Sequence, residues 1–158
     1  MSSRNDNGPF NIFGEAETTI EFYDLDPLQV VWHGNYTNYF ELGRRALLEK
    51  IGYSYMEMME SGFAFPVVEM SLKYLEPLRL KDRIIIKAIL VEYENCLRIK
   101  YEIRRLESDK IAAKGLSTQM AYDIKAGESC FACPKDLIER VEALKTESLG
   151  ENKGVETP

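Results

Sequence analysis

One segment, residues 36–51, limits most strongly what this chain can fold into. Asn35 is suited to begin a helix there and Gly52 to end it. The apolar residues of the segment are Tyr36, Tyr39, Phe40, Leu42, Ala46, Leu47, Leu48 and Ile51. Because they are spread around much of the helical circumference, we expect other elements to enclose this helix on several sides.

Strand-like patterns lie on both sides of this helix in the sequence. A period of two at residues 18–22 predicts a half-buried strand before it. The segments expected after it are a short helix at 55–60, strands at 65–74, 82–93, 97–104 and 111–124, and a last helix from Lys135 to about Leu144. Short turns between the strands favour antiparallel pairing. The order predicts the α+β class, with an antiparallel sheet wrapped around one long central helix.

Length and charge narrow the class of protein further. A chain of 158 residues fits one domain, and its net charge of -6 argues against a nucleic-acid partner. Its apolar runs are too short for a membrane span, and residues 1–14 lack the apolar core of a signal peptide, so we expect a cytoplasmic protein without a membrane partner. We expect residues 1–14 to be a flexible leader, 15–145 the folded domain and 146–158 a disordered tail.

Several common kinds of active site are missing from the sequence. With 1 histidine and 3 cysteines the chain lacks the paired spacing of a zinc site, so neither a metal nor a cofactor is expected. There is no nucleophile elbow, P-loop or dinucleotide fingerprint. We expect the Cys130-Phe-Ala-Cys133 pair to serve packing and the start of the last helix. Any catalysis must therefore use a carboxylate and backbone donors.

The loop before the long helix supplies such a carboxylate. Asp26 follows a predicted strand and is held by Pro27. From there it could attack a thioester carbonyl or deprotonate a water molecule. The start of the helix offers free N–H groups and a positive dipole end for the oxyanion, and a thiolate leaves without a strong general acid. The alternative is that Asp26 only caps a turn, since Asp-Pro is a common turn pair.

Two stretches carry a more specific resemblance. The first is Asp24-x-Asp-Pro-x-x-Val-Val-Trp-His-Gly-Asn-Tyr-x-x-Tyr-Phe-Glu, and the second is Tyr74-Leu-Glu-Pro-Leu-Arg-Leu-Lys-Asp82. Together with the order of strands and helices, they resemble the hotdog-fold acyl-CoA thioesterases related to 4-hydroxybenzoyl-CoA thioesterase. The resemblance extends from about Ile20 to Val141.

The resemblance implies a fold, an activity and a set of site residues. It implies a hotdog fold, a homodimer with a continuous sheet or a homotetramer, and hydrolysis of acyl-CoA to a free acid and CoA. Asp26 then matches the catalytic nucleophile or general base, and the backbone N–H at His33 and Gly34 polarises the carbonyl. The substrate-binding residues on the same stretch are Gln29, Val31, Trp32, Tyr36 and Glu41.

The identity of the acyl group stays open at this stage. Many family members carry glycine where this chain has Gln29, which costs backbone freedom and bears on the shape of the acyl pocket. Side chains that follow the long helix could also line that pocket. These are Tyr53, Tyr55, Met56 and Met59.

The sequence leaves two roles open for each of several side chains. The His33 imidazole is structural or catalytic, and Glu41 either orients the loop or faces solvent. Four basic residues either meet CoA phosphates or keep the sheet surface polar, namely Arg98, Lys100, Arg104 and Arg105. The rival functions are a non-catalytic acyl-CoA-binding protein and a hotdog dehydratase or hydratase, although His33 lies too near Asp26 in sequence for the usual dehydratase pair.

Overall fold

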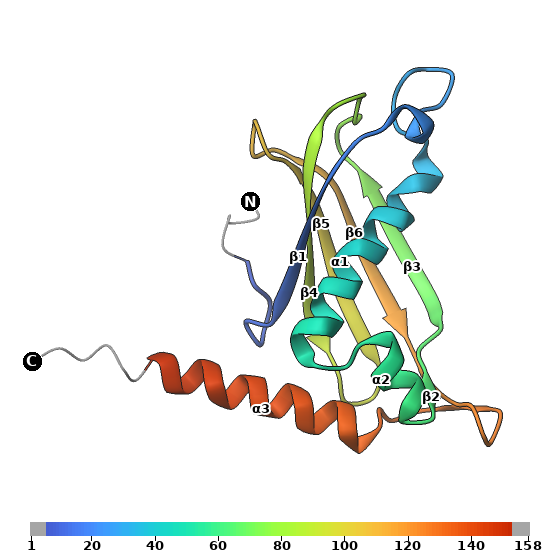
Figure 1. Ribbon diagram of the computed structural model, residues 1–158, viewed down its shortest axis with the longest axis vertical. Helices are drawn as coiled ribbons and strands as arrows, with labels where there is room; N and C mark the ends of the chain where they lie inside the picture. The colour runs from blue at the N-terminus through green and yellow to red at the C-terminus, as the bar shows by residue number, and fades with distance from the viewer. Residues whose placement is uncertain (1–5, 153–158) are drawn as a thin grey trace, which may run out of the picture.

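The computed structural model describes residues 6–152, with side chains as far as residue 147, and shows a curved antiparallel sheet that holds one long helix (Figure 1). The main sheet has 5 strands in the order β1-β4-β5-β6-β3. Their bounds are Phe13–Thr19 (β1), Val67–Tyr74 (β3), Arg83–Glu92 (β4), Leu97–Arg105 (β5) and Ile111–Gln119 (β6). A smaller sheet, in the order β2-β7-β8, is formed by Phe63–Ala64, Ala121–Asp123 and Glu128–Cys130. The expected α+β class is confirmed.

The long helix α1, Tyr36–Ile51, lies against one face of the main sheet. Gly43 brings it so close that a β-carbon there would meet the side chain of Ile86. Phe40 stacks on Tyr101 of β5 with ring centroids 4.5 Å apart. The helix ends where the sequence predicts, at Gly52, which has φ 78° in the left-handed region.

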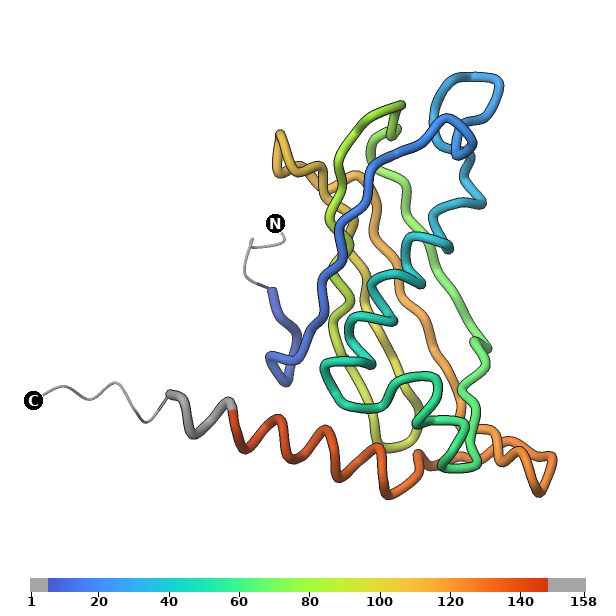
Figure 2. The backbone as a smooth tube through the Cα atoms, in the orientation of Figure 1, coloured from blue at the N-terminus to red at the C-terminus, as the bar shows by residue number. Residues whose placement is uncertain are grey.

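Two further helices close one end of the sheet. Helix α2 is Tyr55–Glu60, and α3 is Lys135–Asn152, of which the last residues extend away from the sheet (Figures 1 and 2). Leu137 and Val141 of α3 are buried. Helix α3 is longer than the sequence indicates and enters the segment expected as a tail, while residues 153–158 lie outside the described residues. Among the described helices, none is long and apolar enough to span a membrane.

Two strand predictions were wrong in their bounds. The strand expected at 18–22 ends at Thr19, and Phe22–Asp24 form a short 3-10 helix in which Phe22 is 79% exposed. The Asp24 carboxylate accepts a hydrogen bond from the Glu21 N–H, which closes this turn. The strand expected over 111–124 is broken after Gln119, so its last part, β7, joins the smaller sheet.

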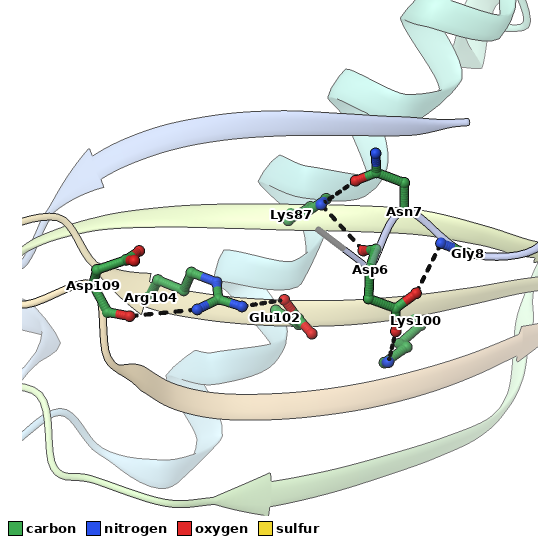
Figure 3. Close-up of polar contacts among 8 residues, drawn as sticks. All are labelled: Asp6, Asn7, Gly8, Lys87, Lys100, Glu102, Arg104 and Asp109. Carbon is green, nitrogen blue, oxygen red and sulfur yellow. Dashed lines mark hydrogen bonds and ion pairs between the residues drawn. The ribbon is translucent and has the colours of Figure 1, made fainter. Parts of the chain in front are cut away.

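The segment expected as a leader is partly bound to the sheet. Strand β1 begins at Phe13, and Ile12 is buried. The Lys100 Nζ donates to the Asp6 carboxylate at 2.8 Å, and the Lys87 Nζ donates to the Asp6 carbonyl at 3.1 Å (Figure 3). These contacts hold the chain before β1 on the sheet face opposite to α1. Residues 1–5 of the expected leader lie outside the described residues.

Candidate active site

The loop before α1 is folded tightly on itself. Leu25 and Val31 form an antiparallel bridge, and between them the Asp26 N–H donates to the Val30 carbonyl at 2.9 Å. The Trp32 N–H donates to the Asp24 carbonyl at 3.0 Å, which joins the start of the loop to its end. The loop therefore returns to the entry of α1 and is held there by its own backbone.

Asp26 takes part in the turn at the tip of this loop. Its Oδ1 accepts a hydrogen bond from the Leu28 N–H at 2.8 Å, and its carbonyl accepts one from the Gln29 N–H at 2.9 Å. The residue is half-buried. A carboxylate has two oxygens, so holding the turn with Oδ1 leaves Oδ2 for other contacts. Asp26 therefore caps the turn, as its Asp-Pro pair predicts, and its second carboxylate oxygen leaves room for a catalytic role as well.

Gln29 occupies a backbone conformation that favours glycine. Its φ is 62°, in the left-handed region. This agrees with the expectation that a residue other than glycine loses backbone freedom at this position. The Gln29 side chain is exposed, so packing of that side chain in the core does not offset the backbone strain.

The entry of α1 is a short 3-10 turn, His33–Asn35. Asn35 does not cap the helix with its side chain, but donates from Nδ2 to the Asp24 carbonyl at 2.8 Å. A β-carbon at Gly34 would lie 2.8 Å or less from three atoms of the Trp32 ring, so any larger residue here would displace that ring. Among the described residues, no acceptor receives the N–H of His33 or of Gly34. These two donors lie at a helix start, where backbone N–H groups have no acceptor within the helix.

A surface depression of about 260 Å³ lies beside this entry. Of the residues expected in the site, it brings together Val31, His33 and Tyr36, whereas Asp26, Gln29, Trp32 and Gly34 do not line it. The end of β3 and the turn after it complete the wall with Tyr74, Leu75, Glu76 and Pro77. The Tyr74 hydroxyl donates to the His33 carbonyl at 3.0 Å, which ties β3 to the helix entry. The sequence-based set did not include Tyr74 as a site residue.

Glu41 lies apart from this depression. It is exposed on α1 and accepts hydrogen bonds from Arg44 at 2.5 Å and from the Tyr55 hydroxyl at 3.1 Å. Facing solvent, one of the two roles left open for it, describes this position, and neither of its bonded partners lies in the loop before α1. Glu41 links α1 to α2.

Tyr39 lies between α1 and the loop and was not selected from the sequence as a site residue. Burial raises the pKa of its hydroxyl, and the nearby Asp24 carboxylate raises that pKa further. The Tyr39 hydroxyl is buried and makes no hydrogen bond of normal geometry. It therefore remains a neutral, polar group beneath the loop.

A second, more apolar pocket of about 500 Å³ lies at the other end of α1. Its walls come from α2, β2, the two residues between β2 and β3, and β7. The lining residues are Tyr55, Met58, Met59, Ala64, Phe65, Pro66 and Tyr122. Tyr55 and Met59 were expected to line an acyl pocket, but Tyr53 is fully buried and Met56 lines a separate depression with Arg45 and Glu49.

Three of the four basic residues considered for CoA phosphates already face carboxylates. The pairs are Lys100 with Asp6 at 2.8 Å, Arg104 with Glu102 at 3.1 Å and Arg105 with Glu76 at 3.2 Å. Cys133 is buried, and its N–H donates to the Glu94 carbonyl at 2.7 Å. Both observations agree with structural roles for these residues.

Known proteins resemble this chain in sequence and in fold. The pattern of the thioesterase-like superfamily matches residues 20–145. The chloroplastic acyl-acyl carrier protein thioesterase ATL3 of Arabidopsis thaliana is 40% identical over 76 residues, which cover 48% of this chain and 40% of ATL3. The match thus spans less than half the length of that relative.

Solved structures agree over almost the whole domain. The DHNA-CoA thioesterase of Staphylococcus aureus has a TM-score of 0.75 at 22% identity, covering 92% of this chain and 97% of its own. A mutant of 4-hydroxybenzoyl CoA thioesterase complexed with 4-hydroxybenzoyl CoA has a TM-score of 0.72 at 18% identity, covering 82% and 99%. At these identities the likeness shows the fold, and it confirms the hotdog architecture.

Proposed function

The chain belongs to the thioesterase-like superfamily, and from this premise we propose that it hydrolyses an acyl-CoA thioester to a free acid and CoA. The observation that carries the proposal is the closure of the loop onto the entry of α1. The Asp24 carbonyl accepts hydrogen bonds from the Trp32 N–H and from Asn35 Nδ2, which joins the loop that carries Asp26 to the helix entry that carries His33 and Gly34. Acyl-thioester hydrolysis needs a carboxylate and N–H donors, and no metal.

Asp26 acts in one of two ways. As a general base it takes a proton from water, whose oxygen bonds to the carbonyl carbon while the carbon–sulfur bond breaks. As a nucleophile its carboxylate forms an acyl anhydride and releases the thiolate, and water then splits the anhydride. In both routes the thiolate of CoA leaves with the electron pair of the broken bond and gains a proton from solvent.

The N–H groups of His33 and Gly34 act on the carbonyl oxygen. Negative charge develops there when the carbonyl carbon is attacked, and two oriented donors at a helix start stabilise it. The Trp32 ring packed over Gly34 and the Tyr74 hydroxyl bonded to the His33 carbonyl keep this backbone in place. The His33 imidazole is exposed and has no role in the proposed step.

The proposal includes pairing of two copies through β3, because a catalytic loop on an exposed surface gives little protection from water. The remaining residues proposed to contact substrate are Val31 and Tyr36, which line the depression, Trp32 at the helix entry, and Gln29 in the turn with Asp26.

Release of free thiol from a panel of acyl-CoA esters tests the function. We expect turnover of at least one ester by the full chain, with one acid and one CoA formed per thioester consumed. Saturable binding of acyl-CoA with no thiol released from any ester would contradict hydrolysis. Loss of enoyl absorbance without thiol release would instead indicate a dehydratase or hydratase.

A further inference from the structure

The peptide between His33 and Gly34 is held by a side chain from a distant strand. Its carbonyl, that of His33, accepts a hydrogen bond from the Tyr74 hydroxyl at 3.0 Å. Tyr74 is the last residue of β3, which ends beside the start of α1 (Figure 1). Hydrogen bonds within a 3-10 turn have poorer geometry than those of an α-helix. A donor on a paired strand therefore adds a fixed point that the turn itself does not provide.

The position of the Tyr74 hydroxyl is determined by the sheet. Tyr74 pairs with Ala113 of β6, and the Leu75 N–H that follows it donates to the Ala112 carbonyl at 2.9 Å. The Tyr74 ring packs edge-on against the buried ring of Tyr36, with ring centroids 4.9 Å apart and an angle of 88° between the ring planes. The hydroxyl is thus placed by contacts of its own strand and ring, independently of the loop before α1.

The hydrogen bond from Tyr74 sets the direction of one particular N–H group. A peptide group is planar, and the peptide between His33 and Gly34 is trans, so its N–H points opposite to its C=O. The N–H of this peptide belongs to Gly34. Fixing the His33 carbonyl therefore also fixes the Gly34 N–H, which is one of the two donors proposed to stabilise the oxyanion.

The other proposed donor, the His33 N–H, is held in a different way. The carbonyl of its peptide belongs to Trp32 and accepts the Asn35 N–H at 2.9 Å. Both partners of that bond are backbone groups, so the direction of the His33 N–H is set within the turn. Of the two donors, the Gly34 N–H is therefore the one whose direction a side-chain hydroxyl controls.

The next peptide, between Gly34 and Asn35, provides an internal comparison. Its carbonyl accepts a hydrogen bond from the Thr37 hydroxyl, also at 3.0 Å. Its N–H, that of Asn35, already donates to the Trp32 carbonyl and cannot serve a substrate at the same time. Two hydroxyl groups thus hold two successive peptides in the same way, but only the peptide held by Tyr74 carries a proposed oxyanion donor.

From these observations we propose that Tyr74 is a positioning residue of the reaction, whose hydroxyl keeps the Gly34 N–H aimed at the developing oxyanion. The inference rests on the proposed function and adds to it a residue that does not touch the reacting atoms. Removing an oxyanion donor altogether lowers kcat by about 10²–10³. Without Tyr74 the donor remains but is no longer preorganised, so we expect kcat to fall about tenfold while KM changes less than about twofold.

The matched variants Tyr74→Phe and Thr37→Val test this role on the acyl-CoA ester that the wild-type chain hydrolyses fastest. Each substitution removes one hydroxyl and nearly preserves the shape of the side chain, so each should lower Tm by a similar amount, about 2–4 °C. Tyr74→Phe should lower kcat about tenfold, whereas Thr37→Val should leave kcat within about twofold of the wild-type value.

Three results of this comparison would overturn the positioning role. The first is a wild-type kcat in Tyr74→Phe, and the second is an equal fall in kcat in both variants. The third is a rise in KM with an unchanged kcat in Tyr74→Phe, which would show that the hydroxyl binds substrate. Unfolding of Tyr74→Phe would count against the role too, because it would show that the hydroxyl serves the fold.

The Gly34 amide reports on the same contact without any turnover. The NMR resonance of an amide nitrogen responds to hydrogen bonding at the carbonyl of its own peptide. Tyr74→Phe should therefore move the Gly34 nitrogen resonance, and Thr37→Val should move that of Asn35 instead. If the Gly34 resonance moves but the wild-type chain releases no thiol from any ester, the hold on this peptide stands and the proposed function fails. If esters are hydrolysed but the Gly34 resonance does not move, the function stands and the positioning role fails.

Discussion

Replacement of Gly14 by alanine should destabilise the fold strongly. Gly14 lies on β1 where the sheet touches α1, and a β-carbon there would lie 2.6 Å from both the Ala46 carbonyl carbon and the Leu47 α-carbon. Ordinary contact begins at 3.4 Å, so the backbone of α1 would have to move away from β1. No side chain can turn aside to make room, because both atoms belong to the helix backbone.

The size of the stability loss follows from the core packing of α1 that this movement would weaken. Phe40, Leu47 and Leu48 of α1 are at most 1% exposed, and a gap approaching 1 Å forfeits a quarter to a half of a packing contact. Overpacking of this kind costs about 1–3 kcal/mol, and the rigid neighbours favour the upper end. For a chain of 158 residues, about 3 kcal/mol corresponds to a fall in Tm of roughly 6–12 °C.

Thermal unfolding at fixed protein concentration measures the effect. Gly62→Ala is the matched control, because Gly62 has φ 88° and nothing lies within 4 Å of its missing β-carbon. It should cost only about 1 kcal/mol of left-handed backbone strain. A Gly14→Ala variant no less stable than Gly62→Ala would refute the close contact between β1 and α1.

Three further predictions concern single groups. Gln29→Gly should raise the unfolding free energy by about 0.5–1 kcal/mol in urea titrations, because Gln29 has φ 62°, and a decrease would contradict backbone strain there. The hydrogen bond from Lys100 and the bond from the Gly8 N–H lower the pKa of Asp6 from its ordinary 3.8. The stability that the ionised Asp6 contributes to the fold is therefore present above pH 3.8 and is lost as the pH falls through the lowered pKa. The protection factors of the amides before β1 should therefore fall at acid pH in the wild type, and already at neutral pH in Asp6→Asn. Burial raises the pKa of Cys133 to about 12, so iodoacetamide at pH 8 should modify it only after unfolding, and rapid labelling in the native chain would contradict this burial.

Local patterns were sufficient to predict the elements that enclose the core. The apolar periodicity of α1, with Asn35 before it and Gly52 after it, gave the helix to the residue. The alternation at 97–104 gave β5 to within one residue. In both places the local preference and the burial of the side chains favour the same structure, so the sequence alone contained enough information.

The binding of the N-terminal segment could not be predicted in this way. Gly8 and Pro9 indicate a loop, and the contacts that hold Asp6 come from Lys87 and Lys100, which are far away in sequence. The break after Gln119 is likewise not local, because β7 leaves β6 to pair with β2 and β8.

The candidate site was predictable to the extent that it is contiguous. The Asp26 loop and the helix entry follow one another along the chain, so one stretch of sequence indicated both. Tyr74 comes from β3, and only the folded sheet brings it to the helix entry. Glu41 was left with two roles, because the sequence does not show that its partner Tyr55 on another helix lies beside it.

The direct test of Asp26 as the catalytic group is the turnover number of Asp26→Asn on the best acyl-CoA ester. Asparagine keeps the oxygen that accepts the Leu28 N–H, so the turn and the Tm should be preserved while kcat falls by about 10²–10⁴. Asp24→Asn, which keeps the bond to the Glu21 N–H, should retain most of the activity. A wild-type kcat in Asp26→Asn, with the fold intact, would contradict the account.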